Sequence, residues 1–163
     1  MGKHHARVYN NLSVANLVGV YDINREQANQ IADKYGVSVM ELDQLLESVD
    51  AVSIVVPTAH HYDLAVECME AGIAILIEKP IVSELDLGQQ LLTKGKRSDS
   101  VVQVGHVERF NPAFVALQEF FAELSVIDTT LKRLGPPPKR HIQDSAVIDL
   151  MIHHSSLAKR QTA

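Results

Sequence analysis

The apolar run at residues 73–77, Ile-Ala-Ile-Leu-Ile, constrains the fold more than any other stretch, and it ends in Glu78-Lys79-Pro80. A short, almost continuous apolar run is typical of a parallel-sheet strand that helices cover on both faces. In open α/β sheets, ligands bind at the carboxyl ends of such strands. A lysine in a proline-stiffened turn at that edge is placed to act on a substrate oxygen. The simpler alternative is a surface ion pair after an ordinary strand.

The rest of the chain alternates apolar runs with amphipathic segments. Apolar runs predict strands at residues 17–22, 51–56 and 101–104, and a short extended piece at 37–40. Helical patterns cover residues 2–10, 24–35, 42–48, 61–71, 84–93 and 111–123, and two of them stop at Gly36 and Gly72. Strand–helix alternation is the signature of right-handed parallel crossovers. The predicted fold class is therefore α/β, a Rossmann-like, doubly wound parallel sheet.

The two ends of the chain depart from that pattern. A doubly wound fold normally opens with a strand and a glycine-rich turn for the pyrophosphate, whereas this chain starts at Met1-Gly2, after the place of that strand. Beyond residue 123 we expect a strand at 126–133, a stiff Gly-Pro-Pro-Pro loop and a helix at 147–158. We therefore expect residues 1–123 to form a dinucleotide-binding domain without its first strand. Residues 124–163 would begin a truncated α+β substrate domain.

Composition excludes several classes of function. The net charge of −5 argues against nucleic-acid binding, and the chain has no polybasic membrane patch. No apolar run approaches the roughly 20 residues of a membrane span, there is no signal-peptide pattern, and the single Cys68 fits a reducing compartment, so we expect a cytoplasmic protein. Six of the eight histidines occur as adjacent pairs, which are poor chelators on a helix, so no metal site is predicted.

Four short motifs occur in order: MGKHHAR at residues 1–7, EKP at 78–80, GHVERFNP at 105–112 and DLMIH at 149–153. Together they resemble the Gfo/Idh/MocA family of NAD(P)-dependent oxidoreductases, over essentially the whole chain up to Ala158. The first motif looks like the continuation of the family's GxGxxG loop, with Gly2 as its third glycine. The resemblance implies hydride transfer between nicotinamide and a secondary alcohol of a sugar, nucleotide sugar or polyol. We also expect a homo-oligomer, because exposed strand edges can pair between chains.

Asp22, at the end of the second strand of the usual order, is the candidate for the adenosine ribose. A carboxylate there accepts both ribose hydroxyls and repels a 2′-phosphate, which favours NAD, while Arg25 nearby keeps NADP possible. The alternative is that Asp22 only caps the next helix.

Further cofactor contacts are implied by the resemblance at Val56, Pro57, Thr58 and His61, and at Glu78, Lys79 and Pro80. Without the family, Thr58 is a helix-start residue and His61 a satisfied polar side chain. The Lys79-Pro80 bond is a candidate cis peptide, as X-Pro bonds allow.

The catalytic residues that the resemblance implies are Lys79, Asp149 and His153. Lys79 would stabilise developing alkoxide charge, and His153 would take the hydroxyl proton. Asp149 stands four residues before His153, on the same helical face, and would orient the imidazole. The alternative is an ordinary surface pair on a helix.

A second hypothesis comes from a different class of function. If the first strand and the substrate domain are absent, the chain is a non-catalytic remnant that binds nucleotide weakly or only self-associates through exposed strand edges. Cofactor titration discriminates between the two hypotheses.

Overall fold

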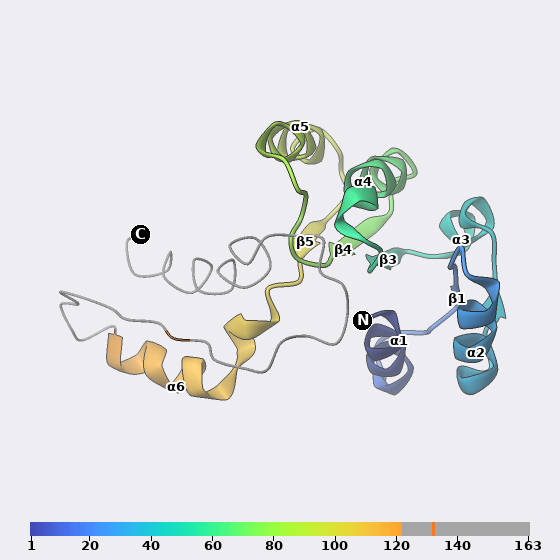
Figure 1. The fold of residues 1–163 in the computed structure, drawn as a ribbon, viewed down its shortest axis with the longest axis horizontal. Helices are drawn as coiled ribbons and strands as arrows, with labels where there is room; N and C mark the ends of the chain where they lie inside the picture. Colours follow the sequence, from blue (N-terminus) through green and yellow to red (C-terminus); the bar gives the residue numbers. More distant parts are fainter. Residues whose placement is uncertain (122–131, 133–163) are drawn as a thin grey trace. The chain divides into compact units, whose positions relative to one another are not determined.

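The computed structural model describes residues 1–121 and Lys132. The described helices and strands follow one another along the chain as α1 (Gly2–Asn11), β1 (Gly19–Val20), α2 (Arg25–Tyr35), β2 (Ser38–Val39), α3 (Leu42–Ser48), β3 (Ala51–Ile54), η1 (Thr58–His60), α4 (His61–Glu70), β4 (Ala74–Ile77), α5 (Leu85–Gly95), β5 (Val102–Val104), η2 (Val107–Phe110) and α6 (Pro112–Phe121) (Figure 1). The predicted strand at 126–133, apart from Lys132, and the predicted helix at 147–158 lie outside this range, as do Asp149 and His153.

The chain divides into two compact units, Met1–Gln103 and Val104–Ala163. The residues of the candidate site and of all described strands, except Val104 at the end of β5, belong to the first unit. The predicted domain boundary at residue 123 falls among residues that are not described, so it stays a prediction.

The described strands of the first unit form two hydrogen-bonded sheets. β1 pairs with β2 in parallel, and β4 lies between β3 and β5 in a three-stranded sheet. β3 and β4 are parallel, with Ser53 opposite Leu76 and Ile54 opposite Ile77. The α/β fold class with parallel strands joined by helices is confirmed.

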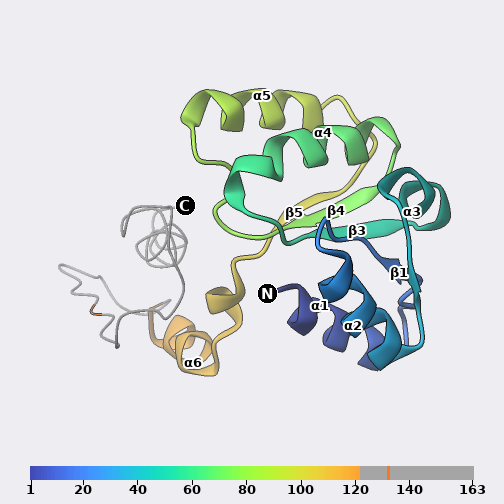
Figure 2. The same cartoon turned by 45° about the vertical axis from the view of Figure 1, so that its right-hand side comes forward.

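The two faces of the β3–β4 pair differ in character, because side chains alternate along each strand. One face carries Ile54, Ile75 and Ile77, which are at most 5% exposed and form the core with residues of α4 and Leu91 of α5. In Figure 2, α4 and α5 cover this face, and α1 and α2 lie on the opposite side of the strands.

Ala74 and Leu76, which point to the opposite face, are only partly buried. The prediction that this strand is fully buried on both faces is therefore wrong for one face. On this face the residue opposite Leu76 is Ser53, which hydrogen-bonds to His5 and Tyr9 of α1, so the packing here is partly polar.

Helix boundaries follow local chemistry. Asn24 caps α2 by accepting the backbone N–H of Gln27 at 3.2 Å, and Gly36 ends the same helix with φ of 68°. Gly72, after α4, has φ of 75°. Both glycines occupy the left-handed region that side chains disfavour, so both predicted stops are confirmed.

Cys68 lies in the core between α4 and the sheet and is 2% exposed. Burial raises the pKa of its thiol to about 11. A structural role for this thiol fits these surroundings. None of the helices in the described part of the chain is both long enough and apolar enough to cross a membrane.

Candidate functional site

The carboxyl ends of β3 and β4 bring two loops to one edge of the sheet. After β3 come residues 55–57 and the 3-10 turn η1, which opens at Thr58. After β4 comes Glu78-Lys79-Pro80, whose Lys79-Pro80 peptide is cis. The backbone N–H of Glu78 donates to the Ile54 carbonyl at 3.0 Å, which extends the pairing of the two strands to the start of the turn.

His61, the first residue of α4, joins these two loops from the α4 side of the sheet. Its Nδ1 lies 2.9 Å from the carbonyl oxygen of Pro80, and its Nε2 lies 2.9 Å from the carbonyl oxygen of Val56. The side chain is 1% exposed. The sequence left open whether His61 contacts a cofactor or is a satisfied polar side chain. The structure places it beneath the loops, bonded to their backbone.

Glu78 faces the opposite side, where α1 lies. Its Oε1 is 2.8 Å from His5 Nε2, and its Oε2 accepts the backbone N–H of Lys79 at 3.2 Å. His5 Nδ1 is 3.1 Å from Ser53 Oγ, which in turn is 2.6 Å from the Tyr9 hydroxyl. A polar chain therefore runs from α1 through β3 to the turn after β4.

The hydrogen bond from His5 is the main reason that the pKa of the Glu78 carboxyl lies below its ordinary value of 4.5. Burial raises this pKa, while the backbone N–H of Lys79 and the nearby positive charges of His5 and Lys79 lower it. The effects that lower the pKa of Glu78 outweigh the effect of burial, so the carboxylate form is favoured at this edge of the sheet.

Asp22 follows β1 by two residues, at the end of the other sheet. Its Oδ1 accepts the backbone N–H of Asn24 at 2.8 Å. The residue that caps α2 is Asn24, so the alternative that Asp22 is itself the helix cap is wrong. Arg25, which kept NADP possible, forms an exposed ion pair with Glu41.

Gly2 is the first residue of α1, and no atom of the described chain lies within 4 Å of the place where a Cβ would stand. The protein's own packing therefore does not require a glycine here. A group that approaches the helix from outside would be a reason for one.

The structure thus gathers Val56, His61, Glu78, Lys79 and Pro80 at one edge, while the roles of these residues, of Pro57 and Thr58 and of the undescribed Asp149 and His153 stay predictions. Sequence reasoning missed His5, Ser53 and Tyr9. Two signals pointed to them: His5 and Tyr9 stand four residues apart on α1, and Ser53 is the one polar residue in the apolar run at 51–56.

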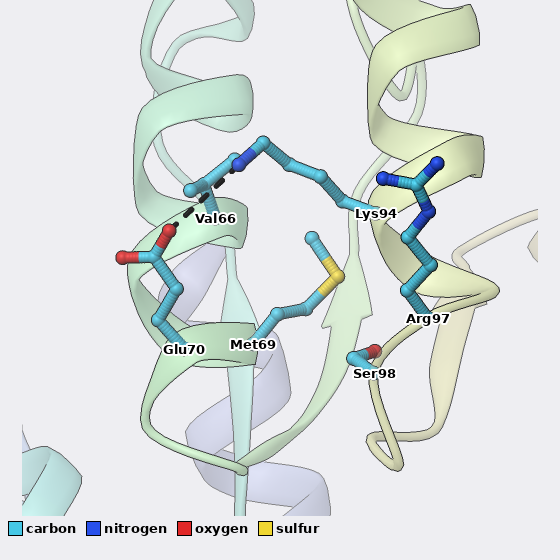
Figure 3. A pocket seen from close by; sticks show the side chains of 6 residues that line it. All are labelled: Val66, Met69, Glu70, Lys94, Arg97 and Ser98. Atoms are coloured by element: carbon cyan, nitrogen blue, oxygen red, sulfur yellow. Dashed lines mark ion pairs between the residues drawn. The ribbon is translucent and has the colours of Figure 1, made fainter.

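A separate hollow lies between α4 and the end of α5, lined by Val66, Met69, Glu70, Lys94, Arg97 and Ser98 (Figure 3). The Lys94 ammonium reaches across it to Glu70, at 3.7 Å. Both side chains are largely exposed, so this pair contributes little to stability. The lining includes none of the predicted site residues.

Comparison with known proteins identifies the family of this chain. A sequence profile of an oxidoreductase family with an NAD-binding Rossmann fold, GFO_IDH_MocA, matches residues 1–106. The chain is 33% identical over 159 residues to a UDP-N-acetylglucosamine 3-dehydrogenase of Acidithiobacillus ferrooxidans, covering 96% of this chain and 50% of that protein. It is 31% identical over 168 residues to an inositol 2-dehydrogenase of Rhizobium meliloti, covering 98% of this chain and 51% of that protein.

Solved structures of similar proteins superimpose on this chain. A UDP-N-acetylglucosamine 3-dehydrogenase of Acidithiobacillus ferrooxidans superimposes with a TM-score of 0.86 at 32% identity, covering 99% of this chain and 53% of that one. A protein from gentamicin A biosynthesis, solved in complex with NAD, superimposes with a TM-score of 0.72 at 28% identity. The match covers 76% of this chain and 36% of that one. The chain spans about half the length of the curated relatives it matches.

Proposed function

Because the chain belongs to the Gfo/Idh/MocA family of oxidoreductases, whose matching domain is an NAD-binding Rossmann fold, we propose that it binds NAD across the carboxyl ends of its parallel strands. The observation that carries the proposal is the pair of loops after β3 and β4, which His61 joins at the place where open α/β sheets bind ligands. Val56, Pro57, Thr58 and the Glu78–Pro80 turn would contact the cofactor there.

The residues present fit a dinucleotide. The open space at Gly2 leaves room for a pyrophosphate against the first turn of α1, whose backbone N–H groups favour an anion. Asp22 would accept the ribose hydroxyls at the end of β1. Arg25 is already paired with Glu41, so NAD is favoured over NADP.

We propose that the protein to which this chain corresponds is a dehydrogenase that oxidises a secondary alcohol. The nicotinamide, when bound, accepts the hydride from the alcohol carbon. Lys79 would hold the reacting oxygen and stabilise its developing charge, because a cationic donor in a partly desolvated turn acts strongly there. His153 would take the hydroxyl proton, with Asp149 orienting its ring.

The substrate class that we propose is a sugar, nucleotide sugar or polyol. The support comes from the relatives, whose names describe a UDP-N-acetylglucosamine 3-dehydrogenase and inositol 2-dehydrogenases. We also propose that the chain forms a homo-oligomer, since both described sheets end in strands whose outer edges can pair.

Isothermal titration of the purified 163-residue chain with NADH, and in parallel with NADPH, tests the proposal. We expect saturable binding, with NADH tighter. If a folded, monodisperse sample binds neither nucleotide, the proposal fails and the alternative of a non-catalytic, self-associating chain is supported.

A further inference from the structure

The Glu78-Lys79-Pro80 turn is held from both faces of the sheet by histidines that sequence reasoning did not assign to this task. We infer that His5 and His61 are positioning residues, which together fix the path of this turn and so the place of Lys79. His5 bonds the carboxylate at the start of the turn, and His61 bonds the carbonyl at its end. Both residues act through backbone and side-chain groups of the turn and not on a substrate.

The contact at His5 has a defined direction. A carboxylate only accepts, so His5 Nε2 must carry the proton that it shares with Glu78 Oε1. When the ring is neutral, Nδ1 accepts from the Ser53 hydroxyl, whose oxygen in turn accepts from Tyr9. When the ring carries both protons, Nδ1 donates to Ser53 instead. In both forms Nε2 donates to Glu78, which favours a single rotamer of that side chain.

The direction of the hydrogen bonds at His61 is also fixed by its partners. Both of its ring nitrogens face carbonyl oxygens, which also only accept. The neutral ring therefore donates to one of the two loops at a time, and the doubly protonated ring donates to both. With the ring 1% exposed, water cannot replace a lost donor, so these bonds restrain both loops.

The sheet geometry explains why two histidines are needed. Glu78 continues the alternation of β4, so its side chain follows Leu76 to the α1 face, whereas the Pro80 carbonyl is reached from α4 on the other face. Each histidine therefore holds a different end of the turn, one from each face of the sheet.

The chain supplies matched controls, because each anchor is one member of a His-His pair whose other member is exposed. His4 precedes His5 on α1, and His60 precedes His61 at the start of α4. Replacing His4 or His60 by Gln changes the same kind of side chain one residue away, without touching the turn.

The first test reads the wild-type histidines directly, by long-range ¹H–¹⁵N correlation of the imidazole rings. We expect His5 with its proton on Nε2, and slowly exchanging ring protons on His5 and His61 but not on His4 or His60. A proton on Nδ1 of neutral His5, or ring protons that exchange as fast as those of His4 and His60, overturns the inference.

The second test compares His5→Asn, His61→Asn and His61→Gln with His4→Gln and His60→Gln. Asn retains a donor near the Nδ1 position, and Gln retains one near the Nε2 position. Each His61 variant therefore keeps the hydrogen bond to one loop and loses the hydrogen bond to the other. We expect His61→Asn to shift the carbonyl ¹³C resonance of Val56 and His61→Gln to shift that of Pro80. We expect His5→Asn, which loses the donor at the Nε2 position, to speed amide exchange at Lys79. Unchanged signals in folded variants overturn the inference.

The link to cofactor binding rests on the proposed function. In folded anchor variants we expect NADH affinity to fall by about three- to tenfold, as the loss of one hydrogen bond predicts, with both controls unchanged. If wild-type chain binds no NADH, the proposed function fails, while the ring and carbonyl signals still decide the positioning roles. If NADH binds and the anchor variants bind it as tightly as wild type, positioning of the site by these residues is refuted.

Discussion

At the scale of single residues, adjacent histidines in the described part of the chain have different surroundings and therefore different roles. Neighbours on a helix point about 100° apart, so one member of a pair faces inward and the other faces solvent. His5 and His61 are the inward members and reach the Glu78–Pro80 turn, whereas His4 and His60 are exposed. The sequence pattern argued against chelation by these pairs but did not reveal that His5 is partly buried and His61 fully buried.

The low pKa of Glu78 makes acid stability a residue-scale prediction. A carboxyl whose pKa is lower in the folded chain binds fewer protons folded than unfolded. It therefore stabilises the fold above its unfolded pKa, and that stability is lost as the pH falls below about 4.5 and passes through the folded pKa.

Urea unfolding at a series of pH values, from about pH 6 downward, measures this loss. We expect His5→Ala to reduce the loss and to cost about 1–2 kcal/mol at the upper end of the series, since it removes a hydrogen bond to a charged group. His4→Ala is the control and should match wild type. Parallel curves for wild type and His5→Ala would refute the link between the two side chains.

The proposed role of Asp22 also belongs to the residue scale. Asp22→Asn removes the negative charge that would repel a 2′-phosphate and weakens acceptance of the ribose hydroxyls. We expect NADH affinity to fall by about tenfold and NADPH affinity to stay or rise, measured by titration calorimetry. Asp43→Asn, at an exposed position of α3, is the control. An unchanged NADH-to-NADPH preference would contradict the assignment.

At the scale of elements, helices were predicted more closely than strands. The range 42–48 agrees with α3. α2 ends directly before its predicted stop at Gly36, and α4 ends two residues before its predicted stop at Gly72. β1 is only two residues long where six were expected, because a strand is recognised by its ladder and β1 has one described neighbour. The 3-10 turns η1 and η2 were missed, since such short turns have no periodic pattern.

The glycine after α2 gives an element-scale prediction. Gly36 has open space at the place where a Cβ would stand but a φ of 68°, so Gly36→Ala is strained through its backbone alone. We expect a loss of about 1 kcal/mol in unfolding free energy, measured by urea denaturation.

Gly2→Ala is the matched control, with open space and no positive φ. It should cost no stability, because alanine is the better helix former. Equal losses in the two variants would show that backbone strain at Gly36 is not the cause.

At the scale of the whole molecule, the described part holds one α/β unit with its polar anchors at one sheet edge. The family match covers residues 1–106 and the chain spans about half of its curated relatives. Activity is therefore a property that we propose for the whole protein, while cofactor binding is open to test on this chain.

Ligand linkage gives the corresponding prediction. A nucleotide that binds only the folded state, present at 100 times its dissociation constant, stabilises that state by about 2.7 kcal/mol. We expect NADH to slow amide exchange in the β3, β4 and β1 ends together, measured by exchange with mass-spectrometric readout. Protection at one loop alone would contradict a dinucleotide lying across the strand ends.

The sequence by itself determined the order of helices and strands, the glycine stops and the family, because apolar periodicity and left-handed glycines are local properties. It also placed Glu78, Lys79 and Pro80 at a strand end. Only the tertiary structure decided which side chains hold that turn. His5 and Glu78 are 73 residues apart in sequence, and their contact depends on α1 lying against the face of β3 that carries Ser53. Such a contact has no sequence period, since it arises from the packing of distant elements.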